Sequence, residues 1–404
     1  MQGQRKKGAL QVLIKVRPSE DENSTSVNKL YVDSTNSQLM VNRATKGNTV
    51  FTYDTVLGKD STQSDLYQQC DHVKFVLNGN NACIMAYGQT SSGKTYSMFG
   101  KDWTDGLSIH KRINHNVANN TNTTSNDVNS NTRAIPDNEQ QQRIFTEDFG
   151  VVPRCINDLF QSLNTLSNSN KHFEYTIHCH IMQIYNEKVY DLIQDKYRKN
   201  PLTIRDTTSS STSSTGPTST TTTNSYNNSS SGTSSSSSSS KSNKVHVKGL
   251  SQYRVNNEEE VVLLIKKSLK NRALRTTDYN IDSSRSHTIV QLYIQIEQAD
   301  IHGIIYIRKS TLSFVDLAGS EKMSTKTVDD SYLNTIQLQI QNTQKETANI
   351  NTSLHVLGLC VSSLIDPRHH HIPYRNSILT RLLQDSLNGL GRTTLIATIH
   401  EGKH

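Results

Sequence analysis

The residues with the clearest chemical meaning in this chain are Gly88–Thr95, which read Gly-Gln-Thr-Ser-Ser-Gly-Lys-Thr. They fit the phosphate-binding pattern G-x-x-x-x-G-K-[ST] at every fixed position. Backbone N–H groups of such a loop surround an anion, the lysine reaches the terminal phosphates, and the last hydroxyl binds Mg²⁺. We therefore expect Lys94 to contact phosphate and Thr95 to bind the metal. The other residues of the predicted cradle are Gly88, Gln89, Thr90, Ser91, Ser92 and Gly93.

The segments on either side of this octet support the interpretation. Ala82–Tyr87 is a short apolar run that predicts a buried strand, and Tyr96–Phe99 can continue a helix. A helix beginning at the loop places its positive N-terminal end beneath the phosphates. The alternative, a chance match in a glycine-containing turn, does not explain the strand directly before the loop. The sequence thus predicts a nucleoside triphosphate site.

Two later segments could supply metal ligands and position a water molecule. Asn280–His287 reads Asn-Ile-Asp-Ser-Ser-Arg-Ser-His and precedes an expected strand, Thr288–Ile296. Taken alone, it could equally be a polar turn. The second segment, Thr311–Glu321, begins as an apolar strand that ends at Asp316 and is followed by Gly319. An acidic residue at the end of a core strand can hold Mg²⁺, and the glycine N–H can sense the γ-phosphate.

Composition predicts one globular domain interrupted by polar insertions. Only 33% of the 404 residues are hydrophobic, although the segments that carry motifs have ordinary apolar content. The stretches at about 108–143 and 207–243 are dominated by Asn, Ser and Thr. Such tracts bury too little apolar surface to offset an ordering entropy of about 1–2 kcal/mol per residue, so we expect disordered surface loops. We therefore expect a single domain over residues 8–400.

The remaining sequence features limit the class of protein. The five scattered cysteines indicate a reducing compartment without a disulfide framework, and no apolar run is long enough to span a membrane. Ala9–Val16 is expected to be a first strand rather than part of a signal peptide, because Lys15 interrupts it. His178-Cys179-His180 is interpreted as one strand with alternating faces rather than a metal site. The net charge of +7 is compatible with an acidic polymer as partner.

Taken together, these motifs resemble those of the kinesin motor domain. Gly88–Thr95, Asn280–His287 and Asp316–Glu321 are similar to its P-loop, switch I (N-x-x-S-S-R-S-H) and switch II (D-L-A-G-S-E). Further similar segments are Val16–Pro18, Val151–Arg154, Ile184–Leu192, Ile372–Ser377 and Leu382–Leu387. The resemblance implies an α/β fold of the P-loop NTPase type, with a central, mostly parallel sheet flanked by helices on both faces. It also implies ATP and Mg²⁺ as cofactors, microtubules as partner, and a cytoplasmic, cytoskeletal location, with no nucleic acid or membrane as partner.

The resemblance also assigns roles to individual residues. The adenine would be lined by Lys15, Arg17, Pro18 and Tyr96. Ser284 and Asp316 would complete the Mg²⁺ shell begun by Thr95. Asn280, Ser283 and Gly319 would close over the γ-phosphate. Glu321 would receive the proton of the attacking water through a water chain and would pair with Arg285 when the switches close.

The segments that would face tubulin depart from the family pattern. Where the family generally has lysines, this chain has Ala348, Thr352 and Ile378. The remaining candidate cations are Lys322, Lys326, Arg368, Arg375 and Arg381. Residues 322–344 form a longer stretch than the family's loop after switch II. The chain could therefore be a microtubule-stimulated ATPase or a nucleotide-dependent binding protein with weak or no motility.

Two further expectations concern the nucleotide and the end of the chain. Asp316 and Gly319 also have the D-x-x-G spacing of GTPases, but no [NT]-K-x-D guanine motif follows, which favours ATP. The sequence stops shortly after an expected strand, Thr394–Ile399, without segments resembling the family's last motor helix, neck linker or stalk. Direction of movement, cargo and oligomeric state do not follow from the sequence.

Overall fold

The computed structural model describes most of the chain outside a few segments. The described residues are 10–18, 29–43, 47–101, 147–170, 172–194, 200–207, 244–279, 283–300, 302–321, 352–366, 368, 371–389 and 391–400. The two insertions predicted at about 108–143 and 207–243 therefore lie outside the described residues, apart from Thr207. Thr207 was predicted to belong to the second insertion, but it forms a strand pair with Lys244. That insertion therefore begins after Thr207.

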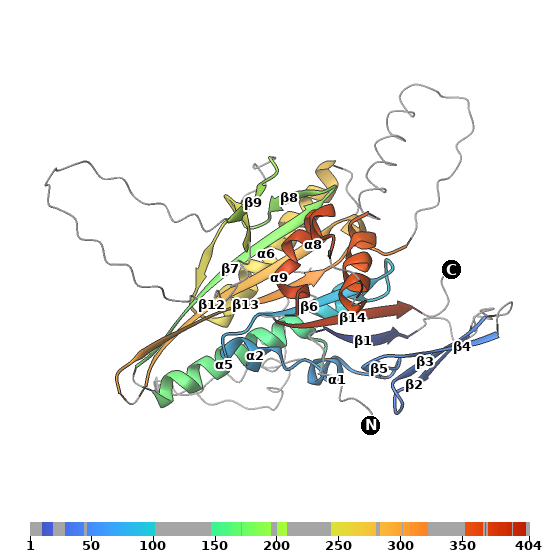
Figure 1. Cartoon of the computed structure of the whole chain (residues 1–404), viewed down its shortest axis with the longest axis horizontal. Coiled ribbons are helices and arrows are strands. Elements are labelled where there is room, and N and C mark those ends of the chain that lie inside the picture. The colour runs from blue at the N-terminus through green and yellow to red at the C-terminus, as the bar shows by residue number, and fades with distance from the viewer. Residues whose placement is uncertain are drawn as a thin grey trace, which may run out of the picture.

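A mixed sheet forms the centre of the molecule, in the order β11-β7-β12-β13-β6-β14-β1-β5 with β8 paired to β7 (Figure 1). Its parallel half contains β1 (Leu10–Arg17), β5 (Thr55–Leu57), β6 (Ala82–Gly88), β13 (Ile305–Asp316) and β14 (Arg392–His400). Its antiparallel half contains β7 (Phe173–Tyr185), β8 (Lys188–Asp191), β11 (Tyr253–Val255) and β12 (His287–Ala299). The carboxyl ends of β6 and β13 lie side by side, and this brings the phosphate loop next to Asp316.

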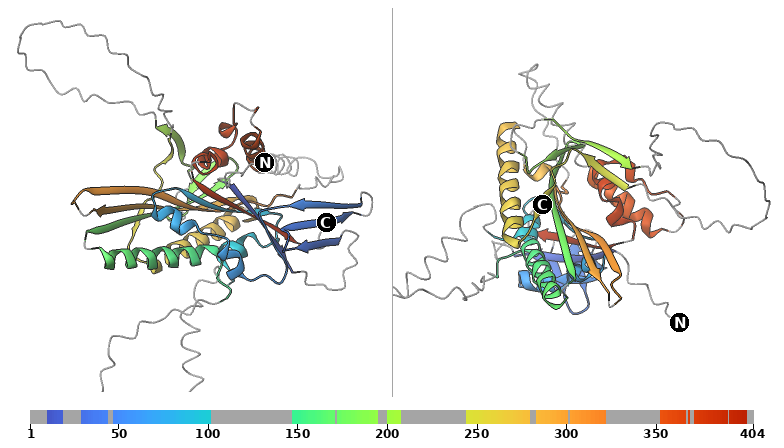
Figure 2. Two further views of the ribbon diagram at one scale, coloured as in Figure 1. Left: turned by 60° about the horizontal axis from the view of Figure 1, so that its bottom comes forward. Right: turned by 90° about the vertical axis from the view of Figure 1, so that its left-hand side faces the viewer.

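Alternation along the strands explains why helices cover both faces of this sheet. In β6, Ala82 and Ile84 pack into one apolar cluster, whereas Cys83 and Met85 pack into another. The first cluster lies beneath α1 (Gln63–Gln68), α2 (His72–Leu77), α3 (Lys94–Phe99), α5 (Val151–Ser169) and α6 (Glu258–Tyr279). The second lies beneath the helix over residues 352–365, α8 (Ile378–Leu382) and α9 (Gln384–Leu387). Figure 2 shows these two helical layers on opposite sides of the sheet.

Smaller elements complete the described structure. They are a three-stranded sheet of β2 (Lys29–Asp33), β3 (Gln38–Arg43) and β4 (Gly47–Thr52), a β9 (Thr203–Thr207) and β10 (Lys244–Lys248) pair, and 3₁₀ turns at Ser283–Arg285 and Tyr374–Asn376. No helix in the described part of the chain is long and apolar enough to cross a membrane. All five cysteines are buried free thiols.

The structure confirms the main elements predicted from the sequence. Strands were expected over Ala9–Val16, Ala82–Tyr87, Phe173–Ile184, Thr288–Ile296, Thr311–Asp316 and Thr394–Ile399, and each coincides with β1, β6, β7, β12, β13 or β14. His178-Cys179-His180 lies within β7, as expected, with Cys179 buried in the core. The helix expected after the octet is α3.

Candidate nucleotide site

The loop Gly88–Thr95 connects β6 to α3, in the arrangement that a phosphate cradle requires. Its backbone turns sharply, with positive φ values at Gly88, Ser91 and Gly93. A Cβ atom at Gly88 would collide with the backbone oxygen of Thr398 on β14, so only glycine fits there. The close approach of β14 and the left-handed turns shape a loop whose N–H groups can face an anion.

Lys94 is folded back onto this loop. Its side chain is 9% exposed, and its Nζ donates to the carbonyl oxygens of Gly88 at 2.9 Å and Gln89 at 2.8 Å. Burial lowers the pKa of Lys94, although the negative charges of Asp316 and Glu321 oppose this effect. The ammonium group therefore lies inside the loop, where it can exchange carbonyl partners for phosphate oxygens.

Two of the three residues predicted to bind the metal, Thr95 and Asp316, come together at the loop. Thr95 Oγ1 donates to Asp316 Oδ2 at 2.8 Å, which joins α3 to the end of β13. The other carboxylate oxygen, Asp316 Oδ1, is buried and has no hydrogen-bond partner in the described structure. A buried carboxylate oxygen without a donor is suited to a metal-bound water. The hydroxyl and carboxylate oxygens at this point therefore fit Mg²⁺.

The two predicted switch segments meet above the loop. The Gly319 N–H donates to the Ser284 carbonyl oxygen at 2.8 Å, and the Ser320 N–H donates to the Gly88 carbonyl at 3.0 Å. Gly319 lies directly against the Glu321 carboxylate and the Thr90 hydroxyl, and a Cβ atom there would push these two side chains aside. These contacts connect both segments to the phosphate loop.

Glu321 contacts the rim of the cradle. Its Oε2 accepts from the Thr90 N–H at 2.7 Å, and its Oε1 accepts from the Thr90 hydroxyl. Partial burial acts to raise the pKa of Glu321, but the bonds from Thr90 and the charge of Lys94 lower it below its usual range. Glu321 is therefore an ionised carboxylate at the loop. Its pairing with Arg285, which is half-buried, stays a prediction for the closed state.

The residues predicted to line the adenine lie at the outer side of the loop. Arg17 Nη1 donates to the Ser91 carbonyl at 2.5 Å, and Tyr96 is 43% exposed, which leaves its ring open to stacking. Lys15 is more deeply placed than a base-contacting residue, because its Nζ donates to Gln63 at 3.0 Å and lies 5.6 Å from the Tyr96 ring centroid. Burial lowers the pKa of Lys15 to about 8, against the raising effect of Asp65. The Lys15 ammonium thus lies near the Tyr96 ring, and Pro18 is exposed.

Sequence reasoning missed Arg272 on α6. Its guanidinium lies 3.5 Å from Asp316 Oδ2 and donates to the Ser286 carbonyl at 3.2 Å, and its side chain is 10% exposed. It therefore balances the buried charge of Asp316 and holds the first switch segment. Arg272 precedes Asn280 by only eight residues, but no pattern around it predicts this contact.

Sequence reasoning also left His287 without a role of its own. The Ala318 N–H donates to its Nδ1 at 3.0 Å, and its Nε2 lies 2.9 Å from Ser353 Oγ. Because Nδ1 accepts, Nε2 carries the proton and donates to Ser353. This neutral ring connects the first switch segment to the second and to the helix over residues 352–365. Burial, and then the charges of Arg272 and Lys94, lower the pKa of His287 to about 3.

Acidification should therefore destabilise the fold before its carboxylates titrate. Between pH 6.5 and 3 the unfolded chain binds a proton at His287 and the folded chain does not, so the free energy of unfolding falls as the pH falls. For His287 alone the loss from pH 6.5 to pH 5 is about 2 kcal/mol. Urea unfolding at both pH values measures it. His287→Asn keeps an acceptor for Ala318 without titrating and should show a smaller loss; an unchanged loss would contradict this account.

Some predicted residues lie outside what the structure describes. Asn280, Lys322, Lys326 and Ala348 are not among the described residues, and only the backbone of Ser283 is described. Each of the described residues predicted as a cation for tubulin has a carboxylate partner. Arg368 lies 2.7 Å from Asp366, and Asp206 lies 3.5 Å from Arg375 and 3.0 Å from Arg381. Thr352 is exposed and Ile378 is half-buried.

A strand, a glycine loop and a helix, with an aspartate from the neighbouring strand bonded to the loop threonine, define a P-loop nucleotide-binding protein. More particularly, the chain belongs to the kinesin motor domain family, whose model matches residues 15–404. Members of this family are in general microtubule-based ATPases that bind nucleotide with Mg²⁺ and associate with the cytoskeleton.

Individual relatives support this assignment. The chain is 30% identical to Kinesin-like protein Klp61F of Drosophila melanogaster over 398 residues, which is 97% of this chain and 30% of that protein. It is 32% identical to Kinesin-related protein 5 of Dictyostelium discoideum over 349 residues, which is 86% of this chain and 26% of that protein. The chain thus spans about a third or less of the length of these relatives.

Solved structures show the same architecture. The structure of a fast kinesin matches with a TM-score of 0.66 at 26% identity, covering 97% of this chain and 85% of that chain. The motor domain of the kinesin-like protein KAR3 of Saccharomyces cerevisiae has the same fold, with a TM-score of 0.64 at 24% identity, covering 98% of this chain and 94% of that chain. The predicted fold class is therefore confirmed.

Proposed function

We propose that this chain is an ATP-hydrolysing motor domain that couples its nucleotide state to microtubule binding. The observation that carries the proposal is the hydrogen-bonded path from the phosphate loop to the helix over residues 352–365. It runs from Gly88 to the second switch segment through Ser320, and from Ala318 through His287 to Ser353. Loss of the γ-phosphate can therefore shift this helix, because the hydrogen-bonded groups between the loop and the helix would move together.

The residues of the site would divide the work of hydrolysis. Bound Mg²⁺ would neutralise charge on the β- and γ-phosphates, and Thr95, Ser284 and Asp316 would hold it. Lys94 would move from its carbonyl partners to the phosphates. Asn280, Ser283 and Gly319 would close over the γ-phosphate, and the ring of Tyr96 would stack on the base.

The ionised Glu321 is the group best suited to receive a proton from the attacking water. Both of its oxygens accept from Thr90, so at least one of these bonds would lengthen or break when Arg285 pairs with the carboxylate. Thr90 and Arg285 would thus compete for Glu321, and the pair with Arg285 would belong to the hydrolytic state.

A second candidate is a nucleotide-dependent binding protein with weak or no motility. It is favoured by the ion pairs that the described candidate cations form with carboxylates of the same chain. Asp206 lies beside both Arg375 and Arg381, and Asp366 pairs with Arg368. Tubulin would have to compete with these carboxylates for the arginines. Exposed ion pairs are worth about 0.2–1 kcal/mol each, so the effect on affinity would be severalfold.

Nucleotide-dependent cosedimentation with microtubules tests the proposal. We expect tighter binding with a non-hydrolysable ATP analogue than with ADP, and weaker binding as salt is added. Asp206→Asn should tighten binding severalfold by freeing Arg375 and Arg381, whereas Asp33→Asn, an exposed change on the distant three-stranded sheet, should not. Equal affinity in all nucleotide states would overturn the coupling.

Removal of the Ser/Thr-rich insertion should leave basal ATP turnover unchanged. The insertion begins after β9, and this strand and β10 pair with each other through five residue pairs that a short turn can still join. In the described structure, the hydrogen bonds and ion pairs of β9 and β10 do not involve the phosphate loop. Turnover of the chain lacking residues 208–243, compared with the intact chain, measures this effect. A drop of tenfold or more would show that the insertion takes part in the site.

A further inference from the structure

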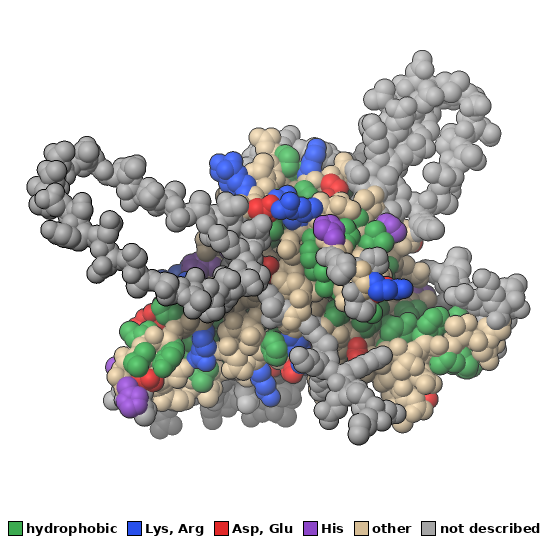
Figure 3. All heavy atoms as spheres, viewed as in Figure 1, with side chains coloured by type: hydrophobic (Ala, Val, Ile, Leu, Met, Phe, Trp, Pro, Cys, Tyr) green, Lys and Arg blue, Asp and Glu red, His purple; other side chains and the backbone are tan. Residues whose placement is uncertain are grey.

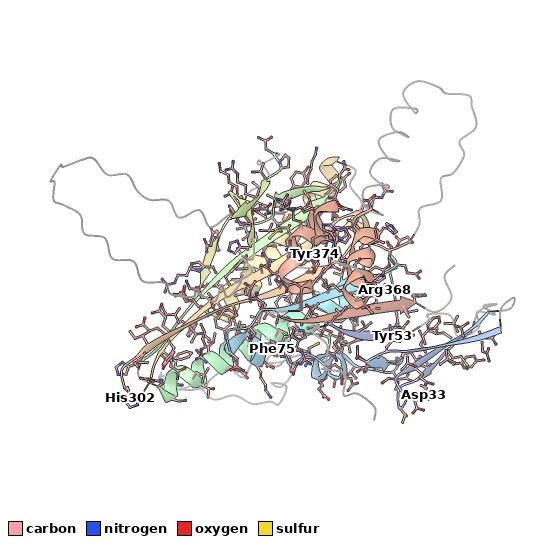
Figure 4. The ribbon with its side chains drawn as sticks, in the orientation of Figure 1. Asp33, Tyr53, Phe75, His302, Arg368 and Tyr374 are labelled. Atoms are coloured by element: carbon pink, nitrogen blue, oxygen red, sulfur yellow. The ribbon has the colours of Figure 1, made fainter. Side chains whose placement is uncertain are left out.

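The end of β14 contacts the phosphate loop through the side chain of Thr398. This residue lies between Lys15 of β1 and Gly88 of β6, two residues before the strand ends. β14 runs through the centre of the sheet and points away from the hairpin turn at His302 (Figure 4). Its carboxyl end therefore lies at the same edge of the sheet as the loop that follows β6. Thr398 is 4% exposed, so its hydroxyl meets the loop inside the molecule.

Two hydroxyl groups connect β14 to the backbone of the loop. Thr398 Oγ1 lies 2.6 Å from Ser92 Oγ, and Ser92 Oγ donates to the Gln89 carbonyl oxygen at 2.7 Å. A second acceptor for Thr398 is the Tyr87 carbonyl oxygen, at 3.3 Å. Each hydroxyl has a single proton, and the bond from Ser92 to Gln89 is much the shorter. The favoured order is therefore Thr398 to Ser92 to Gln89, in which each hydroxyl donates to the next group.

The Gln89 carbonyl oxygen accepts from three donors. They are the Ser92 hydroxyl, the Ser92 N–H at 3.2 Å and the Lys94 Nζ at 2.8 Å. A carbonyl oxygen has two lone pairs, so Lys94 can leave without unpairing this oxygen if both groups of Ser92 stay in place. The Gly88 carbonyl oxygen is similar, because it would keep the Ser320 N–H at 3.0 Å when Lys94 leaves.

We propose that Thr398 is a positioning residue for phosphate binding, because it holds the Ser92 hydroxyl on Gln89 and thereby leaves Lys94 free to move to the phosphates. The inference rests on the proposed function, in which Lys94 makes this move. Without the Thr398 hydroxyl, the Ser92 oxygen, 1% exposed, would be left with no donor in the described structure. An underpaired buried oxygen costs free energy, so Ser92 would rotate away, and Gln89 would then retain Lys94 as its second donor.

Thr398→Val and Thr398→Ser test the proposal, because valine removes the hydroxyl at nearly constant shape and serine restores it. Equilibrium binding of a fluorescent, non-hydrolysable ATP analogue, together with KM and kcat for ATP, measures the effect. In Thr398→Val the dissociation constant and KM should each rise at least about fivefold, as for one lost buried hydrogen bond, and kcat should not fall. Thr398→Ser should bind and turn over ATP like the unmodified chain.

Two further variants make the test specific to this hydrogen-bonded path. Ser92→Ala removes the second donor of Gln89 directly, and the double variant Ser92→Ala/Thr398→Val should lose no more affinity than Ser92→Ala alone. Thr394→Val is the matched control. Thr394 is also buried on the same face of β14, but its hydroxyl donates to Gln11 Oε1 at 3.1 Å, and it should bind nucleotide like the unmodified chain.

The substitutions do not change the outer surface of the protein. Thr398, Ser92 and Thr394 are 4%, 1% and 0% exposed, whereas Lys and Arg side chains gather on the surface around β9 (Figure 3). A general defect of folding would reduce the amount of active protein, and it would therefore lower kcat without changing KM or the affinity of the folded fraction. The affinity and KM measurements thus separate positioning of the loop from stability.

The outcomes distinguish this inference from the proposed function. Unchanged affinity and KM in Thr398→Val, a fall in kcat alone, or a loss that Thr394→Val shares or Thr398→Ser does not restore would overturn the inference and leave the proposed function standing. An unmodified chain that binds ATP without hydrolysing it would overturn the proposed function, and nucleotide affinity would still test Thr398. A chain that binds no nucleotide would overturn both.

Discussion

Glu321→Ala should abolish ATP hydrolysis while leaving ATP binding nearly intact. The carboxylate is ionised, and it sits at the rim of the phosphate loop, where it is bonded to the Thr90 N–H. Removing a group that receives a proton in the transition state typically lowers the rate by about 10²–10⁴-fold. Single-turnover hydrolysis and the equilibrium binding of a fluorescent ATP analogue measure the two quantities separately.

Arg285→Ala should have the same phenotype if Arg285 pairs with Glu321 in the hydrolytic state. Thr90→Val serves as the control for the contact observed here, because it removes the hydroxyl bond to Glu321 and leaves the carboxylate in place. We expect Thr90→Val to reduce turnover far less than Glu321→Ala. Turnover preserved in Glu321→Ala or Arg285→Ala would contradict the assigned roles.

Arg272→Met should produce the largest loss of stability among single changes near the site. The variant leaves Asp316 buried, 3% exposed, without its guanidinium partner. Breaking a buried pair from one side typically destabilises a protein by about 3–5 kcal/mol, and the nearby Lys94 ammonium would offset part of this loss. Urea unfolding of the variant and the unmodified chain measures the difference.

The double variant Arg272→Met/Asp316→Asn separates charge from packing. It removes both charges and should recover a large part of the stability that Arg272→Met loses. The free energies of unfolding of the double variant and of the two single variants should then differ from additivity by about 0.5 kcal/mol or more. Arg368→Met breaks an ion pair whose arginine is 88% exposed, and it should leave the free energy of unfolding nearly unchanged. If Arg272→Met were no more harmful than Arg368→Met, the buried pair would not stabilise the fold.

Local patterns were sufficient to predict the phosphate loop and its flanking elements. Ala82–Tyr87 is apolar because β6 is buried on both faces, and the fixed glycines of Gly88–Thr95 follow from the close approach of Thr398 and the turns of the loop. Thr95 and Asp316 were predicted to hold one metal ion, and they lie together because the carboxyl ends of β6 and β13 are adjacent.

Contacts between distant elements could not be predicted in this way. Arg272 reaches Asp316 only because α6 crosses the face of the sheet next to β13, and the spacing of residues along α6 does not encode that position. His287 looked like the last residue of a polar motif, and its bond to Ser353 depends on how the helix over residues 352–365 packs. The exposure of Ile304–Ile307 at the end of the β12–β13 hairpin is equally hidden in the sequence, because such an apolar run is typical of a buried strand.

The family resemblance also could not settle the surface that would face tubulin. It identified Arg375 and Arg381 as candidate cations, but the structure adds Asp206 between them. Since Asp206 lies on β9, next to the start of the Ser/Thr-rich insertion, this carboxylate has no counterpart in the short motifs that carry the resemblance. We therefore expect Asp206 to reduce the contribution of Arg375 and Arg381 to binding of the track.

Steady-state ATP turnover of this chain, with and without polymerised microtubules at low and physiological salt, tests the central claim most directly. The account predicts measurable basal turnover that microtubules stimulate strongly, with a smaller effect at the higher salt because charge pairs are screened. Basal turnover that microtubules leave unchanged would contradict the proposed coupling between the phosphate loop and the helix over residues 352–365.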